Sequence, residues 1–190
     1  MTKPIASLEL LERRMRWEET RNLLIGAGVA IDRLPKEWKP SIDLSEVNLI
    51  GEDLRGANLG WVVLYRASLR GISLCGARMS GAVLRGADLR KASQSGADLT
   101  KAAMYKTNLH RAQLRQTVLV KTDLCRADLR RADLTGSDMR GVFLTAADLR
   151  GADLTGADLY GANVEDVLYN CSTTWPVWFR PASHGAVETA

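Results

Sequence analysis

The dominant pattern in the sequence is a leucine, or a near substitute, at every fifth position from Leu44 to Val164. These 25 positions keep one register, and a small or β-branched residue stands two places before each of them except Leu54, where Glu52 takes that place. An Asp or Asn often lies between the two, and a Gly often follows two places after the leucine. A short fixed period sustained over such a length predicts a repeat architecture.

A period of five matches neither regular element, because a helix needs apolar residues three and four apart and a strand needs strict alternation. Alternation holds here for one step only, so the pattern predicts a short extended segment followed by a corner. The small residue and the leucine point inward while the residue between them points out. Glycine suits the corner. Such a segment cannot bury its leucine alone, so successive segments must wind into coils and stack.

The motif A(D/N)LxG, present at 87–89, 127–129 and 157–159, resembles the signature of the pentapeptide-repeat proteins, especially the Leu-rich cyanobacterial members. The resemblance covers about two-thirds of the chain. It implies an all-β fold, a right-handed quadrilateral β-helix with four pentapeptides per coil and about six coils. Some members protect DNA gyrase by mimicking DNA, so a topoisomerase- or gyrase-interacting protein is an expectation by resemblance alone.

Three regions follow from this pattern: residues 1–40, the repeats at 41–169, and residues 170–190. Residues 6–25 contain no Gly or Pro and many helix formers, which predicts a helical cap over the first coil. The alternative is a partner-binding helix. Trp175, Trp178 and Phe179 predict an aromatic cap on the last coil, with a mobile tail after Pro181.

Bulk properties narrow the class of protein. The chain has 190 residues, 46% apolar and 25% charged, and no apolar run approaches the roughly 20 residues that span a bilayer. The absence of a signal-peptide core and the odd count of 3 cysteines favour a cytoplasmic protein. We expect a monomer or a dimer without membrane contact. Neither of the 2 histidines stands near a cysteine at metal-ligand spacing, and no phosphate-binding loop is present. We therefore expect no enzyme activity, no cofactor and no metal.

Several polar residues occupy inward positions. Gln94 interrupts the leucine series, and its amide is expected to bond to nearby backbone or to a water, because an unpaired buried amide costs roughly 1–3 kcal/mol. Four further inward residues carry hydroxyls that are expected to meet backbone carbonyls: Thr107, Thr117, Thr122 and Ser137.

With four pentapeptides per coil, residues 20 apart stack, and this predicts a basic belt. Residues 60–131 hold 14 Lys and Arg against 4 Asp and Glu, whereas residues 41–59 and 132–170 are net acidic. Such a belt suits an acidic protein or a nucleic-acid backbone and argues against DNA mimicry. The alternative is an ordinary ladder of solvated Arg–Asp pairs. The belt residues singled out as candidates are Arg70, Arg90, Lys91, Arg111, Arg130 and Arg131.

A second face carries apolar groups where solvent is expected. An exposed aromatic patch rimmed by cations predicts a protein contact. The alternative is that the N-terminal helix folds over the patch. Arg85 stands between two tyrosines, which predicts a cation–π ladder. The patch comprises Trp61, Val63, Tyr65, Val83, Arg85, Ala103 and Tyr105, with Arg66, Lys106 and Arg126 at its corner.

The sequence thus predicts a non-enzymatic scaffold that binds an unidentified protein partner through the basic belt and the aromatic patch. Nucleic-acid binding through the belt is the alternative. It is weaker because the belt has few aromatic side chains for stacking and no element that enters a groove.

Overall fold

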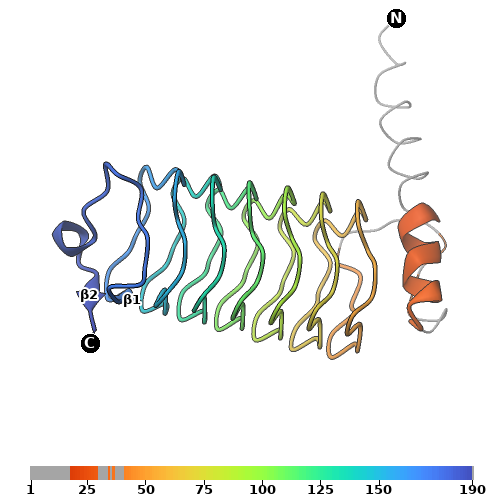
Figure 1. Ribbon diagram of the computed structural model, residues 1–190. Coiled ribbons are helices and arrows are strands. Elements are labelled where there is room, and N and C mark those ends of the chain that lie inside the picture. The colour runs from red at the N-terminus through yellow and green to blue at the C-terminus, as the bar shows by residue number, and fades with distance from the viewer. Residues whose placement is uncertain (1–17, 30–33, 35, 37–40, 190) are drawn as a thin grey trace, which may run out of the picture.

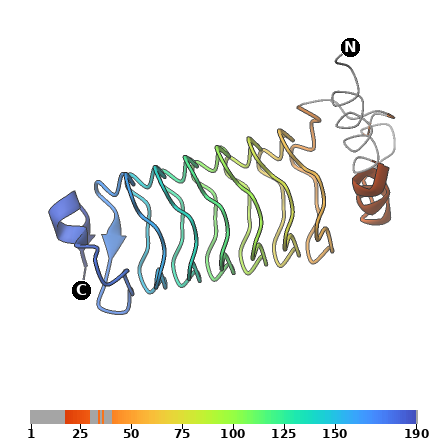
Figure 2. The same ribbon diagram turned by 90° about the horizontal axis from the view of Figure 1, so that it is seen from above.

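The computed structural model describes residues 18–29, 34, 36 and 41–189. From residue 41 the chain winds as a stack of coils along one axis, seen from two directions in Figures 1 and 2. Parallel bridges join residues 20 apart, beginning with Asp43 to Val63 and continuing in the same register to Phe143 with Asn163 and Asp148 with Leu168. Each coil is therefore four pentapeptides long, and residues 20 apart lie on the same face.

Each pentapeptide ends in a β-turn. In the first, the Val47 N–H donates to the Leu44 carbonyl at 3.2 Å, and the third turn residue, Glu46, has a φ of 59°. The same corner position has a positive φ in every repeat from 46 to 166, as in type II turns. The prediction of corners is confirmed, but glycine fills only 12 of the 25, and 13 other residues accept the left-handed conformation at some cost.

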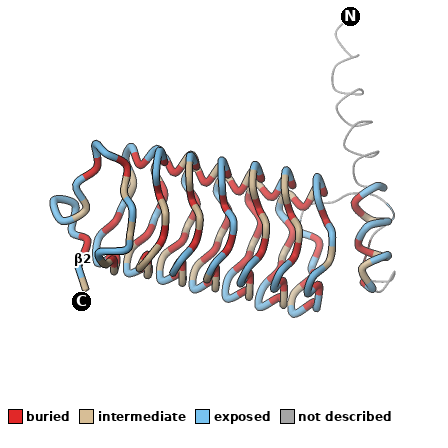
Figure 3. The backbone as a smooth tube through the Cα atoms, viewed as in Figure 1, coloured by how far each residue is buried: buried red, intermediate tan, exposed pale blue. Residues whose placement is uncertain are grey.

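The core is the ladder of leucines and small residues inside the coils, and buried positions alternate with exposed ones along the tube in Figure 3. The predicted hydroxyl bonds are confirmed: Thr107, Thr117 and Thr122 donate to backbone carbonyls at 2.8 to 3.0 Å, and Ser137 does so at 2.7 Å. Of the two partners expected for the Gln94 amide, backbone or a water, the described backbone is not one. Its side chain is fully buried, and neither amide atom has a partner among the described residues, because the leucines above and below it offer no polar atom.

A helix at 18–26 lies across the end of the solenoid where the first coil begins (Figure 1). Leu24 is fully buried with the leucines of the first coils. The Thr20 hydroxyl accepts a hydrogen bond from the Asn58 N–H at 2.8 Å. The rest of the predicted helix, residues 6–17, lies outside the described residues.

The C-terminal region continues the winding beyond the repeats. Strand β1, Leu168–Tyr169, pairs in parallel with β2, Val187–Glu188, and the 3-10 helix η2, Pro181–His184, comes between them. The prediction of a mobile tail is wrong, because the N–H groups of Val187 and Thr189 donate to the preceding coil at 2.8 Å. The edge of the preceding coil has backbone carbonyls that no further repeat would pair, and the tail pairs with them. The five-residue pattern does not reveal this pairing.

Aromatic rings gather at this end. Trp175 stacks on Phe179 with centroids 5.3 Å apart and meets Tyr169 edge-on at 5.7 Å. Phe179 is buried, which agrees with the predicted lid. Trp178 meets Phe179 edge-on with centroids 5.6 Å apart but is 57% exposed, so it lies at the outer edge of the lid.

Candidate binding surface

The residues of the predicted aromatic patch lie on one face of the solenoid. Bridges join Val63 to Val83 and Val83 to Ala103, which places these three side chains in one column. We call the face formed by them with Trp61, Tyr65, Arg85 and Tyr105 the aromatic face. Trp61 is 55% exposed and Tyr65 39% exposed, so the described helix at 18–26 does not cover them.

Cations lie against both tyrosine rings of the aromatic face. The Arg85 guanidinium lies 5.4 Å from the Tyr105 centroid, and the Lys106 ammonium lies 5.3 Å from it. Tyr65 is contacted instead by Arg66, at 5.1 Å. Arg85 therefore does not bridge the two tyrosines as predicted; each ring meets a cation from its own coil or the coil before. These contacts hold the rings and the charges together on one surface.

Trp61 has a structural role that sequence reasoning missed. Its ring lies over the corner of the next coil, where a Cβ added to Gly81 would come within 2.5 Å of the indole. Gly81 is buried under this ring. Other large corner residues lie over glycines in the same way: Arg66 over Gly86, Lys121 over Gly141. A large corner residue followed by Gly 20 positions later is the sequence signal for this contact.

Most cations of the basic belt are of two kinds; Arg70, which follows Ser68 and Leu69, belongs to neither, because it has no ion pair with a described residue and is not at a corner. Arg90, Arg130 and Arg150, one place after a buried leucine, form a column on one face with the acids that precede them. The Arg130 Nη2 lies 2.7 Å from Asp128, and its Nε lies 3.6 Å from Asp148. Arg90 pairs with Asp88, and Arg150 with Asp148. For these three, the interpretation as Arg–Asp pairs is confirmed.

The pKa values of the paired acids reflect these contacts. A hydrogen bond from the Arg90 side chain holds the pKa of Asp88 below its usual value. Burial acts to raise the pKa of Asp128, but the hydrogen bonds and charge of Arg130 outweigh it, so this pKa is also lowered. Both carboxylates therefore stay ionised to a lower pH than an unpaired aspartate does.

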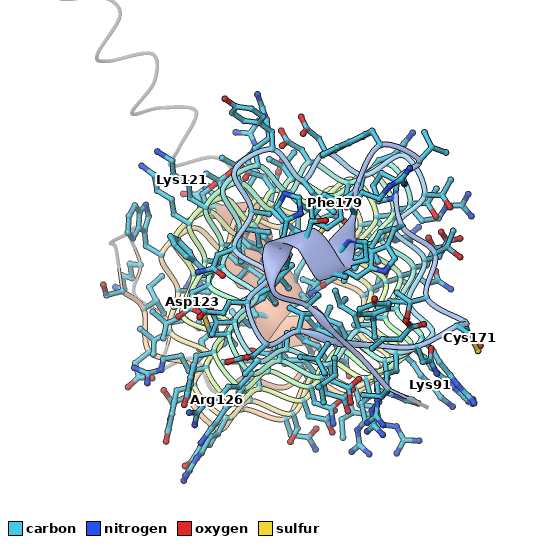
Figure 4. The ribbon with its side chains drawn as sticks, turned by 90° about the vertical axis from the view of Figure 1, so that its left-hand side faces the viewer. Lys91, Lys121, Asp123, Arg126, Cys171 and Phe179 are labelled. Carbon is cyan, nitrogen blue, oxygen red and sulfur yellow. The ribbon has the colours of Figure 1, made fainter. Side chains whose placement is uncertain are left out.

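The second kind of cation stands at the corners and is exposed. We call these eight the corner cations; none of them forms an ion pair with a described residue. Each has a positive φ, between 52° and 58°. They form rows along three corners of the solenoid. In the end view of Figure 4, Lys121, Arg126 and Lys91 each mark one of these corners. The corner cations are Arg66, Lys91, Lys101, Lys106, Arg111, Lys121, Arg126 and Arg131.

The corner rows frame the aromatic face on both sides. Lys101 and Lys121 lie at the corner before it, and Arg66, Lys106 and Arg126 at the corner after it. The remaining row, Lys91, Arg111 and Arg131, lies one face further round, beyond the column that holds Arg70 and Arg90. The structure thus brings the predicted site residues onto two adjacent faces, with unpaired charge concentrated at their corners.

Two classes of site are not found. No group of three or more His, Cys, Asp or Glu side chains that could hold a metal ion occurs within the described ranges. The helical part of the chain that the structure describes has neither the length nor the apolar character needed to cross a membrane.

Comparison with known proteins gives the family. A family model described as pentapeptide repeats matches residues 42–81, 77–115, 107–145 and 127–166, which together span most of the chain. The chain belongs to the pentapeptide-repeat family, as its A(D/N)LxG motifs predict. Proteins of this family fold as right-handed quadrilateral β-helices and are generally structural or interaction proteins. No curated protein gives a significant match to the sequence.

Two solved structures are similar in fold. HetL, a pentapeptide repeat protein involved in heterocyst differentiation regulation from the cyanobacterium Nostoc sp. strain PCC 7120, matches with 23% identity and a TM-score of 0.51, over 76% of this chain and 84% of HetL. Trypsin-treated QnrB1, a plasmid-mediated fluoroquinolone resistance protein, matches with 18% identity and a TM-score of 0.50, over 77% of each chain. At these identities the likeness shows the fold alone.

Proposed function

We propose that this protein is a non-enzymatic scaffold that binds an acidic protein partner on the aromatic face and on the corner cations around it. The observation that carries the proposal is the combination of exposed rings with unpaired charge. Trp61 and Tyr65 are more than one-third exposed, and corner cations border them on two sides. Protein interfaces favour aromatic and Arg side chains at their centres, and charge at the rim guides the approach of the partner.

An acidic protein is favoured over nucleic acid by the position of the rings. The aromatic face holds its tyrosine rings beside cations, whereas the ring in the column of Arg90 and Arg130 is the imidazole of His110, whose Nδ1 is buried. The described solenoid also has flat faces and no projecting element that would enter a groove. A role directed at DNA gyrase rests on family resemblance alone, and unchanged gyrase supercoiling in the presence of the protein would dismiss it.

The proposal is tested with immobilised protein and two variants. Tyr65→Ala with Tyr105→Ala should abolish capture of a specific partner, because it removes the centre of the contact. Tyr160→Ala is the matched control, since Tyr160 is 78% exposed but lies on another face. Capture that is equal with all three proteins would place the site elsewhere.

The nucleic-acid alternative has its own measurement. Fluorescence anisotropy with duplex DNA across a salt series should show no tight binding if the partner is a protein. Tight binding that weakens steeply with salt, and that is lost in Arg111→Glu with Arg131→Glu, would instead make the belt a phosphate-binding surface.

A further inference from the structure

An open pocket of about 370 Å³ lies between the last regular coils and the C-terminal region. It forms where the winding leaves its register: Asp153 bridges Thr174, a step of 21 residues instead of 20. The additional residue makes the loop at 170–173 bulge outward at the corner that carries Lys91 and Cys171, which lie on the same side of the end view in Figure 4. The pocket is open to solvent between this loop and the end of the basic belt.

Side-chain hydrogen bonds hold the loop that forms one wall. At this corner the Gly151 N–H donates to the side-chain oxygens of Asn170 and Thr173, each at 3.1 Å. In the regular coils this N–H donates to a main-chain carbonyl of the next coil. The Asn170 Oδ1 also accepts from the Ser172 N–H at 3.2 Å, and the Thr173 hydroxyl donates to the Leu149 carbonyl at 3.0 Å. These hydrogen bonds fix the position of the loop, so the wall of the pocket is a defined part of the fold.

The lining of the pocket is basic. His110, Arg130, Arg131 and Arg150 line it together with Gly151, Asn170 and Ser172, and no acidic side chain is among these described lining residues. Arg130 and Arg150 bind their carboxylates through Nε and Nη2. The Nη1 donors of these two arginines have no bond to a described residue.

Arg131 adds a charge that no carboxylate compensates within the described structure. Its aliphatic stem lies against the corner of the next coil, where a Cβ on Gly151 would be 3.4 Å from the Arg131 Cγ. The side chain thus extends along the solenoid axis toward the pocket. Because residue 151 is a glycine, no Cβ narrows the space that the Arg131 side chain occupies.

His110 lines the pocket together with these arginines. Its Nδ1 is buried and has no hydrogen-bond partner among the described residues. Burial lowers the pKa of His110, and Arg130, Arg111 and Arg131 lower it further against the opposing effect of Asp128. The imidazole is therefore largely neutral at pH 7 and would gain a proton more readily if an anion entered the pocket.

We propose that this pocket binds a small phosphate monoester. Guanidinium groups match phosphate oxygens in pairs, and Arg131 with the free donors of Arg130 and Arg150 supplies several such contacts. Ser172 also lines the pocket, and its hydroxyl can serve as a further donor. The open mouth leaves room for the organic substituent of the ester. The proposal does not depend on the partner-binding function, because the pocket and the aromatic face lie on different faces.

The experiment follows the histidine resonances by NMR while inorganic phosphate or phenyl phosphate is added at constant ionic strength, set with sodium chloride. The chain has only 2 histidines, and His184, which bonds to the Arg180 carbonyl on η2, serves as an internal control. Saturable shifts of His110 with both probes are expected, together with a rise in its pKa, while His184 stays unchanged.

Two corner variants make the test specific. Arg131→Gly removes the uncompensated charge and keeps a residue suited to the left-handed corner, where φ is 57°. Arg126→Gly is the matched control, since its φ is 58° and it also lacks an ion pair with described residues, but it lies at another corner. We expect Arg131→Gly to weaken phosphate binding at least about tenfold and Arg126→Gly to bind as the wild type does.

Three outcomes would overturn the proposal. The first is a His110 response to phosphate no larger than that to sodium chloride. The second is equal phosphate affinity in the wild type and Arg131→Gly, with thermal unfolding showing that the variant is folded. The third is binding of inorganic phosphate with exclusion of phenyl phosphate, which would contradict the assignment to an ester. None of these results bears on capture of a protein partner.

Discussion

Two neighbouring columns of the basic belt differ in what their cations can do. Arg90, Arg130 and Arg150 each bind an aspartate two residues earlier in the same pentapeptide. The corner cations Lys91 and Arg131 follow directly after two of these arginines, yet they form no ion pair with a described residue. One place in the repeat therefore separates a cation that is already neutralised from one that can meet a partner.

The difference arises from the geometry of the turn. A side chain one place after the leucine leaves the face close to the outward Asp of its own pentapeptide, so the two groups meet. The corner residue has a left-handed φ, which directs its side chain along the axis toward the same corner of the next coil. No carboxylate stands beside the side chain there. A count of charges along the sequence therefore overstates how strongly Arg90, Arg130 and Arg150, the face arginines, attract an acidic partner. It understates the attraction by the corner cations.

The largest effect is expected from closing the space into which a corner side chain extends. Gly81→Ala should lower the free energy of unfolding by about 1 kcal/mol for the left-handed backbone. Displacement of the Trp61 ring should add about 1–3 kcal/mol. Gly96→Ala is the control, because both glycines have a φ of 68° and a Cβ at Gly96 meets nothing within 4 Å. Equal losses in chemical denaturation would show that Trp61 does not rest on this corner.

The second prediction concerns the backbone cost of the corner cations. Replacing Lys91, Arg111 and Arg131 together by Gly should leave stability unchanged or raise it by up to about 1 kcal/mol per site. Glycine adopts the left-handed corner without the clash that a Cβ brings, and this gain exceeds or balances its greater freedom in the unfolded chain. Denaturant titration measures the effect. A clear loss of stability would mean that these side chains make contacts that hold the fold.

The triple glycine substitution above is the corner variant. Its matched comparison is the face variant, in which the face arginines are replaced. Replacing Arg90, Arg130 and Arg150 together by Gln removes the same three charges, but it breaks pairs with Asp88, Asp128 and Asp148. The melting temperature should fall by a small amount, since these arginines are exposed and such pairs contribute little. If this variant were as stable as the corner variant, the distinction between the two columns would have no energetic meaning.

The smallest effect is the response to acid. The pKa values of Asp88, Asp128 and Asp138 are lowered in the folded protein, so their contribution to stability is full above the ordinary carboxyl value of 3.8. It is lost as the pH falls through the lowered folded-state values. Thermal melts of the wild type should therefore show a decline below about pH 4. The corner variant should keep this decline, and the face variant should show less of it.

Much of the fold could be predicted because the relations that build it are local. The five-residue period identifies the buried leucines, the glycine positions and the inward Thr107, Thr117 and Thr122, all from neighbours within one repeat. The pairing of Asp88 with Arg90 is also predictable, since the two residues are two places apart. Gln94 could be recognised as an interruption, but its lack of a partner depends on the coils above and below it.

Several features of the surface join residues about one coil apart, and only the folded chain reveals them. Trp61 meets Gly81, Arg131 lies over Gly151, and β2 extends the sheet at β1. The pocket exists because one additional residue shifts the loop at 170–173 out of register. A five-residue signal determines which side chains turn inward, but stacking decides which corner side chain lies over which neighbour, because it brings residues 20 apart in the sequence together.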